Sequence, residues 1–201
     1  MKLYIRFMVS LRCKLIAKEE LTKLKLQILD TDLGVVEIRE DITKEQRELL
    51  TKRLLRFGME LLDDTRSSLI KKIENETIDL IYEPDPSVPT DFADALTKKL
   101  GYQPELISSL FAEVRGISLK QFIIIQKVER AKELLLYDEL TTAKISALLK
   151  FRSREDLVYQ FKKITGLTPS FFKVLKQKRK SVAKLVKGNS VSANAKNKIL
   201  G

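Results

Sequence analysis

Histidine and tryptophan are absent from the 201-residue sequence, and cysteine occurs once, at Cys13. Without histidine the chain cannot use Ser-His-Asp or Cys-His catalysis or bind zinc through imidazole. A single cysteine excludes a CxxC redox centre and an intramolecular disulfide, as expected in a reducing cytosol. The seven glycines are too dispersed for a GxGxxG motif or a P-loop. These absences predict a protein that is not an enzyme and holds no cofactor.

Long apolar runs are also missing. No segment reaches the ~18 consecutive apolar residues of a membrane span. Residues 1–9 contain Lys2 and Arg6 and lack the apolar run and cleavage site of a signal peptide. We therefore expect a cytoplasmic protein without a membrane partner.

Positive charge is concentrated beyond Pro86. Lysine and arginine number 38 against 27 aspartates and glutamates, a formal net charge of +11. Residues 1–86 carry 16 basic and 17 acidic side chains, residues 87–173 carry 14 and 10, and residues 174–201 carry eight and none. This asymmetry predicts that the second half of the chain meets a polyanion.

The first 64 residues show the pattern of a small α+β domain. Apolar and polar side chains alternate over residues 3–9, as in a strand with one buried face. Helical spacing follows at residues 15–24 and 43–57, with Leu15, Leu49 and Leu55 on the expected buried faces. Short β-type runs lie at residues 26–29, 35–38 and 59–62. This β-α-β-β-α-β order predicts a ferredoxin-like domain at residues 1–64.

A further amphipathic helix is expected at residues 65–82, capped by Asp64 or Thr65. Pro84, Pro86 and Pro89 cannot continue a helix, so residues 65–89 are expected to connect two domains.

The loop Met8-Val9-Ser10-Leu11-Arg12-Cys13 resembles the Met-x-Cys-x-x-Cys loop of heavy-metal-associated domains, which share this element order. In that family two thiolates grip a soft monovalent metal. Here Ser10 stands in place of the first cysteine. Cys13 is interpreted as a small apolar residue at a helix start, so no metal site is predicted; the alternative is a metal-responsive sensor that uses Cys13.

Residues 90–175 predict an all-α domain with two helix-turn-helix units. Helical patterns cover residues 91–100 and 104–115, then residues 143–149 and 154–165, and a long helix at 118–137 joins the two pairs. The two units form a weak internal repeat, in which Gly116 and Gly166 occupy equal offsets after the second helix.

The strings FKKITGLTPSFFK (residues 161–173) and AKELL (residues 131–135) resemble the DNA-binding domain of AraC-type transcription regulators. The resemblance implies double-stranded DNA as partner, with the second helix of each unit in a major groove and the two readers ~34 Å apart. The positions that match base readers are Glu105, Ser108 and Ser109 in the first unit and Arg154, Glu155, Val158 and Tyr159 in the second. Positions that match phosphate contacts are Lys98, Lys99, Arg152, Lys162 and Lys163.

The last segment, residues 176–201, lacks acidic residues and apolar periodicity, which predicts a disordered basic tail.

The function predicted for the whole chain is a sequence-specific transcription regulator. A second alternative is a protein-binding adaptor with weakened DNA binding. Two protein partners are considered: a second copy of the chain, through the N-terminal domain and helix 65–82, and RNA polymerase.

Overall fold

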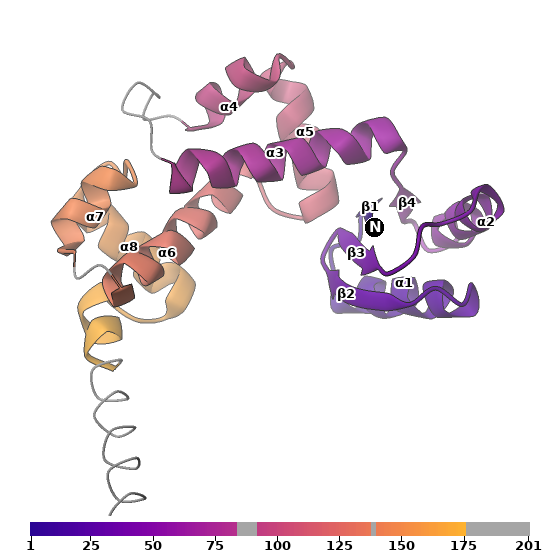
Figure 1. Cartoon of the computed structure of the whole chain (residues 1–201), viewed down its shortest axis with the longest axis horizontal. Coiled ribbons are helices and arrows are strands. Elements are labelled where there is room, and N and C mark those ends of the chain that lie inside the picture. The colour runs from indigo at the N-terminus through magenta and orange to yellow at the C-terminus, as the bar shows by residue number, and fades with distance from the viewer. Residues whose placement is uncertain (84–91, 138–139, 176–201) are drawn as a thin grey trace, which may run out of the picture. The chain divides into compact units, whose positions relative to one another are not determined.

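The computed structural model describes residues 1–83, 92–137 and 140–175 (Figure 1). The chain forms two compact units, residues 1–123 and residues 124–201, and the boundary between them falls inside helix α6 (Leu119–Tyr137). The three prolines of the expected linker and the basic tail lie outside the described residues. No helix in the described ranges is both long and apolar enough to cross a membrane.

The first unit begins with a four-stranded antiparallel sheet. Its elements are β1 (Lys2–Arg6), α1 (Leu11–Lys23), β2 (Ile28–Asp32), β3 (Val35–Ile38), α2 (Lys44–Leu55) and β4 (Glu60–Leu61). The strands lie in the order β2-β3-β1-β4, with Leu3 opposite Val36 and Ile5 opposite Leu61. We refer to residues 1–62 as the N-terminal module.

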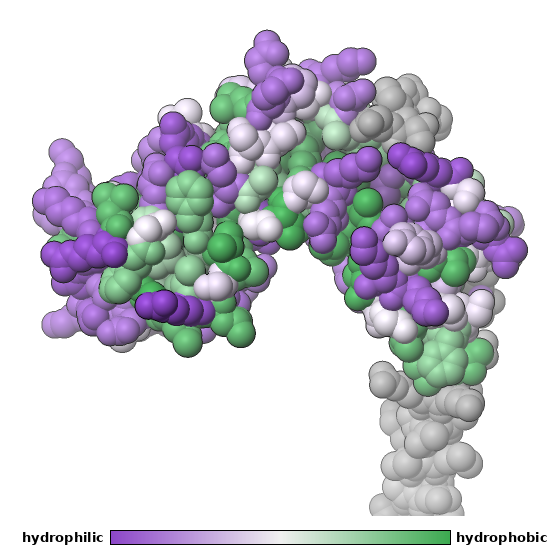
Figure 2. Space-filling view, turned by 180° about the vertical axis from the view of Figure 1, so that it is seen from behind, coloured by the Kyte–Doolittle hydropathy of each residue, from purple (hydrophilic) through white to green (hydrophobic). Residues whose placement is uncertain are grey.

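One face of this sheet carries the core of the module. Leu3 and Ile5 of β1 are buried together with Leu21 of α1 and Leu50 and Leu54 of α2. The expected burial of Leu15, Leu49 and Leu55 is wrong, since these side chains are 67%, 41% and 56% exposed. The sheet is narrow, so it covers only one stripe of each helix, and apolar side chains remain on the surface of the first unit (Figure 2).

The first strand is shorter than its alternating pattern suggested. It ends at Arg6, and Phe7 adopts φ 63°, which breaks the alternation and leaves Phe7 and Val9 about half exposed. Ser10 then caps α1 by accepting a hydrogen bond from the N–H of Cys13.

Helices α2 and α3 begin at recognisable caps. A capping box of Thr43 and Gln46 opens α2. The cap of α3 (Asp64–Tyr82) is Asp63 rather than Asp64 or Thr65, because the Asp63 carboxylate accepts from the N–H of Arg66 at 2.8 Å.

The opposite face of the sheet meets α3. Tyr4 alternates with Leu3 and Ile5 and therefore points to the other side, where its hydroxyl donates to Glu74 of α3 at 3.0 Å. Burial and the Glu74 carboxylate both raise the pKa of the Tyr4 phenol above its ordinary value. Helices α4 (Phe92–Leu100) and α5 (Pro104–Arg115) pack against α3 and complete the first helix-turn-helix.

The second unit contains the rest of α6, α7 (Thr142–Leu148), α8 (Arg154–Thr165) and helical residues 169–175. Phe161 of α8 is fully buried, and its ring lies 5.5 Å from that of Phe172. The buried Lys127 ammonium donates to the carbonyl of Lys150 at 3.1 Å. Lys150 adopts φ 51° in the turn between α7 and α8, a conformation that favours glycine.

Candidate nucleic-acid interface

The start of α8 is held by a small set of polar contacts. Ser153 is the N-cap, and its hydroxyl accepts a hydrogen bond from the N–H of Asp156 at 3.1 Å. The Asp156 carboxylate in turn accepts from the backbone N–H of Arg152 at 3.3 Å. These bonds fix the turn that leads into α8 and therefore the direction in which the helix presents its outer face.

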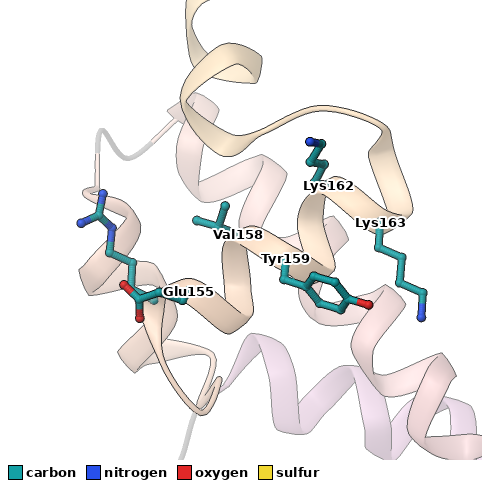
Figure 3. Close-up of a pocket in the computed structure, with 6 residues that line it drawn as sticks. Glu155, Val158, Tyr159, Lys162 and Lys163 are labelled. Carbon is teal, nitrogen blue, oxygen red and sulfur yellow. The ribbon is translucent and has the colours of Figure 1, made fainter.

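The outer face of α8 is open and carries cations next to an aromatic ring. Figure 3 shows Tyr159 and Lys163 extending to one side of the helix, with Glu155 near its other end. A surface depression of about 820 Å³ is lined by Arg154, Glu155, Val158, Tyr159, Lys162 and Lys163. The structure thus brings together the α8 positions that match base readers with two that match phosphate contacts.

The charges on this face are available to a ligand. In the second unit, as far as it is described, Arg154, Lys162 and Lys163 form no ion pair. Glu155 accepts from its own backbone N–H and from Ser153, and these bonds lower the pKa of its carboxyl group. The face therefore presents three cations and one ionised carboxylate at neutral pH.

The outer face of α5 has a different character. Glu105, Ser108 and Ser109 are all exposed on it. The helix has one basic residue, Arg115, in its last turn. In the preceding helix, Lys99 is ion-paired with Glu76 of α3, and that bond raises the pKa of the Lys99 ammonium.

The last turn of α5 is bound to the N-terminal module. Arg6 of β1 pairs with Glu113 of α5 and also with Glu60 of β4, at 2.8 Å. The Arg115 guanidinium reaches Asp32 at the end of β2 at 3.2 Å. The sequence pattern does not single out these residues, because partners about 80 to 107 positions apart leave no periodic signal.

Cys13 is half-buried against the apolar core of the N-terminal module, and the sequence holds no second thiol. The Ser10 hydroxyl donates to the Cys13 sulfur at 3.1 Å. Met8, the nearest methionine along the sequence, is fully buried in the core of the module. Across the described ranges, no three His, Cys, Asp or Glu side chains cluster so as to hold a metal ion.

Comparison with known proteins matches the C-terminal part of the chain. Residues 96–174 match the family model described as a helix-turn-helix domain. An uncharacterized HTH-type transcriptional regulator of Bacillus subtilis (strain 168), YtdP, is 28% identical over 109 residues, which are 54% of this chain and 14% of that protein. The F1 operon positive regulatory protein of Yersinia pestis is 30% identical over 82 residues, which are 41% of this chain and 27% of that protein. The chain therefore contains a helix-turn-helix domain and spans less than a third of either relative.

Solved structures are similar to about half of this chain. The C-terminal domain of AraT, a response regulator from Geobacillus stearothermophilus, has a TM-score of 0.47 at 19% identity and covers 53% of this chain and 84% of its own. The DNA-binding domain of AdpA, solved in complex with a target DNA, has a TM-score of 0.47 at 17% identity and covers 55% and 94%.

Proposed function

We propose that the chain is a sequence-specific transcription regulator of the AraC type, and not an enzyme, that binds double-stranded DNA and reads two adjacent major-groove segments with α8 and α5. The observation that carries this proposal is the open face of α8, where Arg154, Lys162 and Lys163 flank an exposed tyrosine. The helix-turn-helix match over residues 96–174 and the names of the two relatives support the same function.

The side chains of α8 suit distinct parts of a duplex. Arg154 at the start of the helix can donate two hydrogen bonds to a guanine edge, while Val158 and Tyr159 offer apolar contact to a thymine methyl group. Arg152, Lys162 and Lys163 carry the charge for the flanking phosphates, which set orientation and affinity without reading sequence.

The side chains of α5 suit base contact without phosphate contact. Glu105 can accept a hydrogen bond from cytosine N4, and Ser108 and Ser109 can donate to or accept from base edges. The only cation of the helix is bound within the protein. We therefore assign to α5 a contribution to specificity, and to α8 most of the electrostatic affinity.

The N-terminal module is proposed to be a ferredoxin-like domain that regulates this DNA binding. The order of its elements and the sheet order β2-β3-β1-β4 support that assignment. We propose a second copy of the chain as its partner, with RNA polymerase as a further partner of the regulator.

The basic tail, residues 176–201, is proposed to add salt-dependent affinity without sequence preference.

Selection from a random duplex library with the full-length chain tests the proposal. Affinity for the selected duplex is then compared with affinity for a shuffled duplex of the same composition, at two salt concentrations. We expect the selected duplex to bind at least ~10³-fold more tightly. The alternative, a protein-binding adaptor, is favoured by the acidic residues of α5. It would be supported if the selected and shuffled duplexes bound with a ratio of affinities near one and if binding were weak and salt-labile.

A further inference from the structure

We propose that the N-terminal module positions the reading helix α5, with Arg115 and Gly34 as positioning residues, in place of the phosphate contacts that usually orient such a helix. The inference rests on the proposed function, because it concerns how α5 is held when it meets DNA. It assigns to Arg115 and Gly34 a role in DNA recognition without contact to DNA.

Arg115 is committed to the protein by all three of its guanidinium nitrogens. Nη1 donates to the carbonyl of Leu33 at 3.0 Å, Nη2 reaches Asp32 at 3.2 Å, and Nε lies 3.4 Å from the Glu74 carboxylate. The side chain of Arg115 is only 15% exposed. Each guanidinium nitrogen thus has a partner in the β2–β3 hairpin or α3, and the largely buried group offers little surface to a phosphate.

Gly34 lets the hairpin approach the end of α5 more closely than any side chain would allow. A Cβ atom built at Gly34 would lie 1.7 Å from the carbonyl oxygen of Val114. A looser contact occurs at Gly116, where a Cβ atom would lie 3.2 Å from Cγ1 of Val9. The hairpin and the loop after β1 therefore both touch the last turn of α5.

Recognition helices ordinarily take their orientation from phosphate contacts on either side of the groove. On α8 we assign such contacts to Lys162 and Lys163, which are exposed. On α5 the charged residues are Glu105, Glu113 and Arg115, so the helix has more acidic than basic side chains. The outer face of α5 remains exposed while its last turn is bound to the N-terminal module. The face that would contact bases is therefore free, and protein contacts at the end of the helix set its orientation.

The test uses the full-length chain and two changes on opposite sides of this contact, Arg115→Gln and Gly34→Ala. Each variant is put through selection from the random duplex library, and the salt dependence of binding is measured on the duplex selected by the unaltered chain. Gly58→Ala is the matched control for Gly34→Ala, because Gly58 has a similar φ of 72° and a Cβ atom there would meet nothing within 4 Å. Lys162→Gln is the matched control for loss of a cation that contacts phosphate. Circular dichroism verifies the fold of every variant.

We expect Arg115→Gln and Gly34→Ala to lose sequence preference in one of the two selected segments and to keep it in the other. The slope of log affinity against log salt should stay unchanged in Arg115→Gln, while Lys162→Gln should reduce it by about one. Gly58→Ala should select the same two segments as the unaltered chain.

Three results would overturn the inference. A reduced salt slope in Arg115→Gln with both segments retained would make Arg115 a phosphate contact. Full preference in both segments for Arg115→Gln and for a folded Gly34→Ala would show that the module does not position α5. Selection of only one segment by the unaltered chain would show that only one of the two helices reads bases, and it would overturn the two-segment reading as well. Sequence-specific DNA binding, the core of the proposed function, fails only when no segment is selected.

Discussion

The backbone N–H of Phe7 donates to the carbonyl oxygen of Glu113 at 2.9 Å. The last carbonyl groups of a helix have no partner within the helix, so the chain that follows β1 satisfies one of them in α5. The positive φ of Phe7 is the point at which the backbone leaves the sheet to make this bond. A residue early in the sequence thereby completes a helix more than a hundred positions later.

Gly34→Ala should destabilise the protein more than Gly58→Ala. Both glycines have positive φ, so alanine costs about 1–2 kcal/mol at either position. At Gly34 the new methyl group also collides with the Val114 carbonyl, whereas at Gly58 it enters open space. Urea denaturation of the two variants measures the difference. Equal losses of stability would mean that the hairpin and α5 separate at little cost.

Arg154→Ala should relax base preference at one position of the recognised site, by ~1–3 kcal/mol for a bidentate contact. Lys162→Ala should weaken binding to all sequences similarly, because it removes a phosphate contact. Competition binding with a panel of single-base variants of the selected duplex separates the two effects. An unchanged preference in Arg154→Ala would show that α8 docks differently from our assignment.

Lys150→Gly should be more stable than Lys150→Ala by about 1 kcal/mol, since only glycine adopts φ 51° without steric cost. Both variants lose the lysine side chain, so the comparison isolates the backbone. Thermal unfolding of the two proteins gives the answer, and a more stable alanine variant would mean that the turn rearranges.

Ser153→Ala should destabilise α8 by about 1 kcal/mol through loss of the N-cap, and it should raise the pKa of Glu155. The folded state lowers the pKa of Glu155 from its ordinary 4.5, so the associated stability is present above that value and is lost as the pH falls through the lowered pKa. Carbon-13 NMR titration of the Glu155 carboxyl checks the shift. The same midpoint with and without the Ser153 hydroxyl would remove this explanation.

Cys13→Ala should leave metal content and DNA affinity unchanged. The thioethers of the core against which Cys13 packs belong to Met8 and Met59, and both side chains are buried. Competition for Cu(I) against a high-affinity chelator is the measurement. Stoichiometric retention of copper by the unaltered chain, lost in Cys13→Ala, would instead make the N-terminal module a metal sensor.

Local signals in the sequence predicted most element boundaries. Gly116 and Gly166 follow the second helix of each unit, as the sequence pattern placed them, and both adopt a left-handed conformation. The outer face of α8 was also predictable, because its residues are close together on one helix. Burial was less predictable: Leu15 lies on an apolar stripe, but the small sheet does not extend far enough to cover it.

The contacts of Arg6 and Arg115 could not be predicted from the sequence. Each is a single cation among many, and its partners come from other elements distant in the chain. Gly34 adopts φ 76° in the turn between β2 and β3. Its second role, to admit a helix end against the hairpin, depends on packing that no local pattern encodes.

The compact units do not coincide with the stretch that matches the helix-turn-helix family. That stretch starts at residue 96, whereas α5 shares its compact unit with the sheet, and α6 contributes to both units. A truncated fragment that begins near residue 90 would keep Arg115 and Val114 but lose Asp32, Glu74 and the Gly34 hairpin. Exchange of the helix-turn-helix stretch between relatives would likewise separate α5 from the surface shaped to receive it. Chimaeras of this protein should therefore be cut elsewhere, with the first 123 residues transferred as one piece.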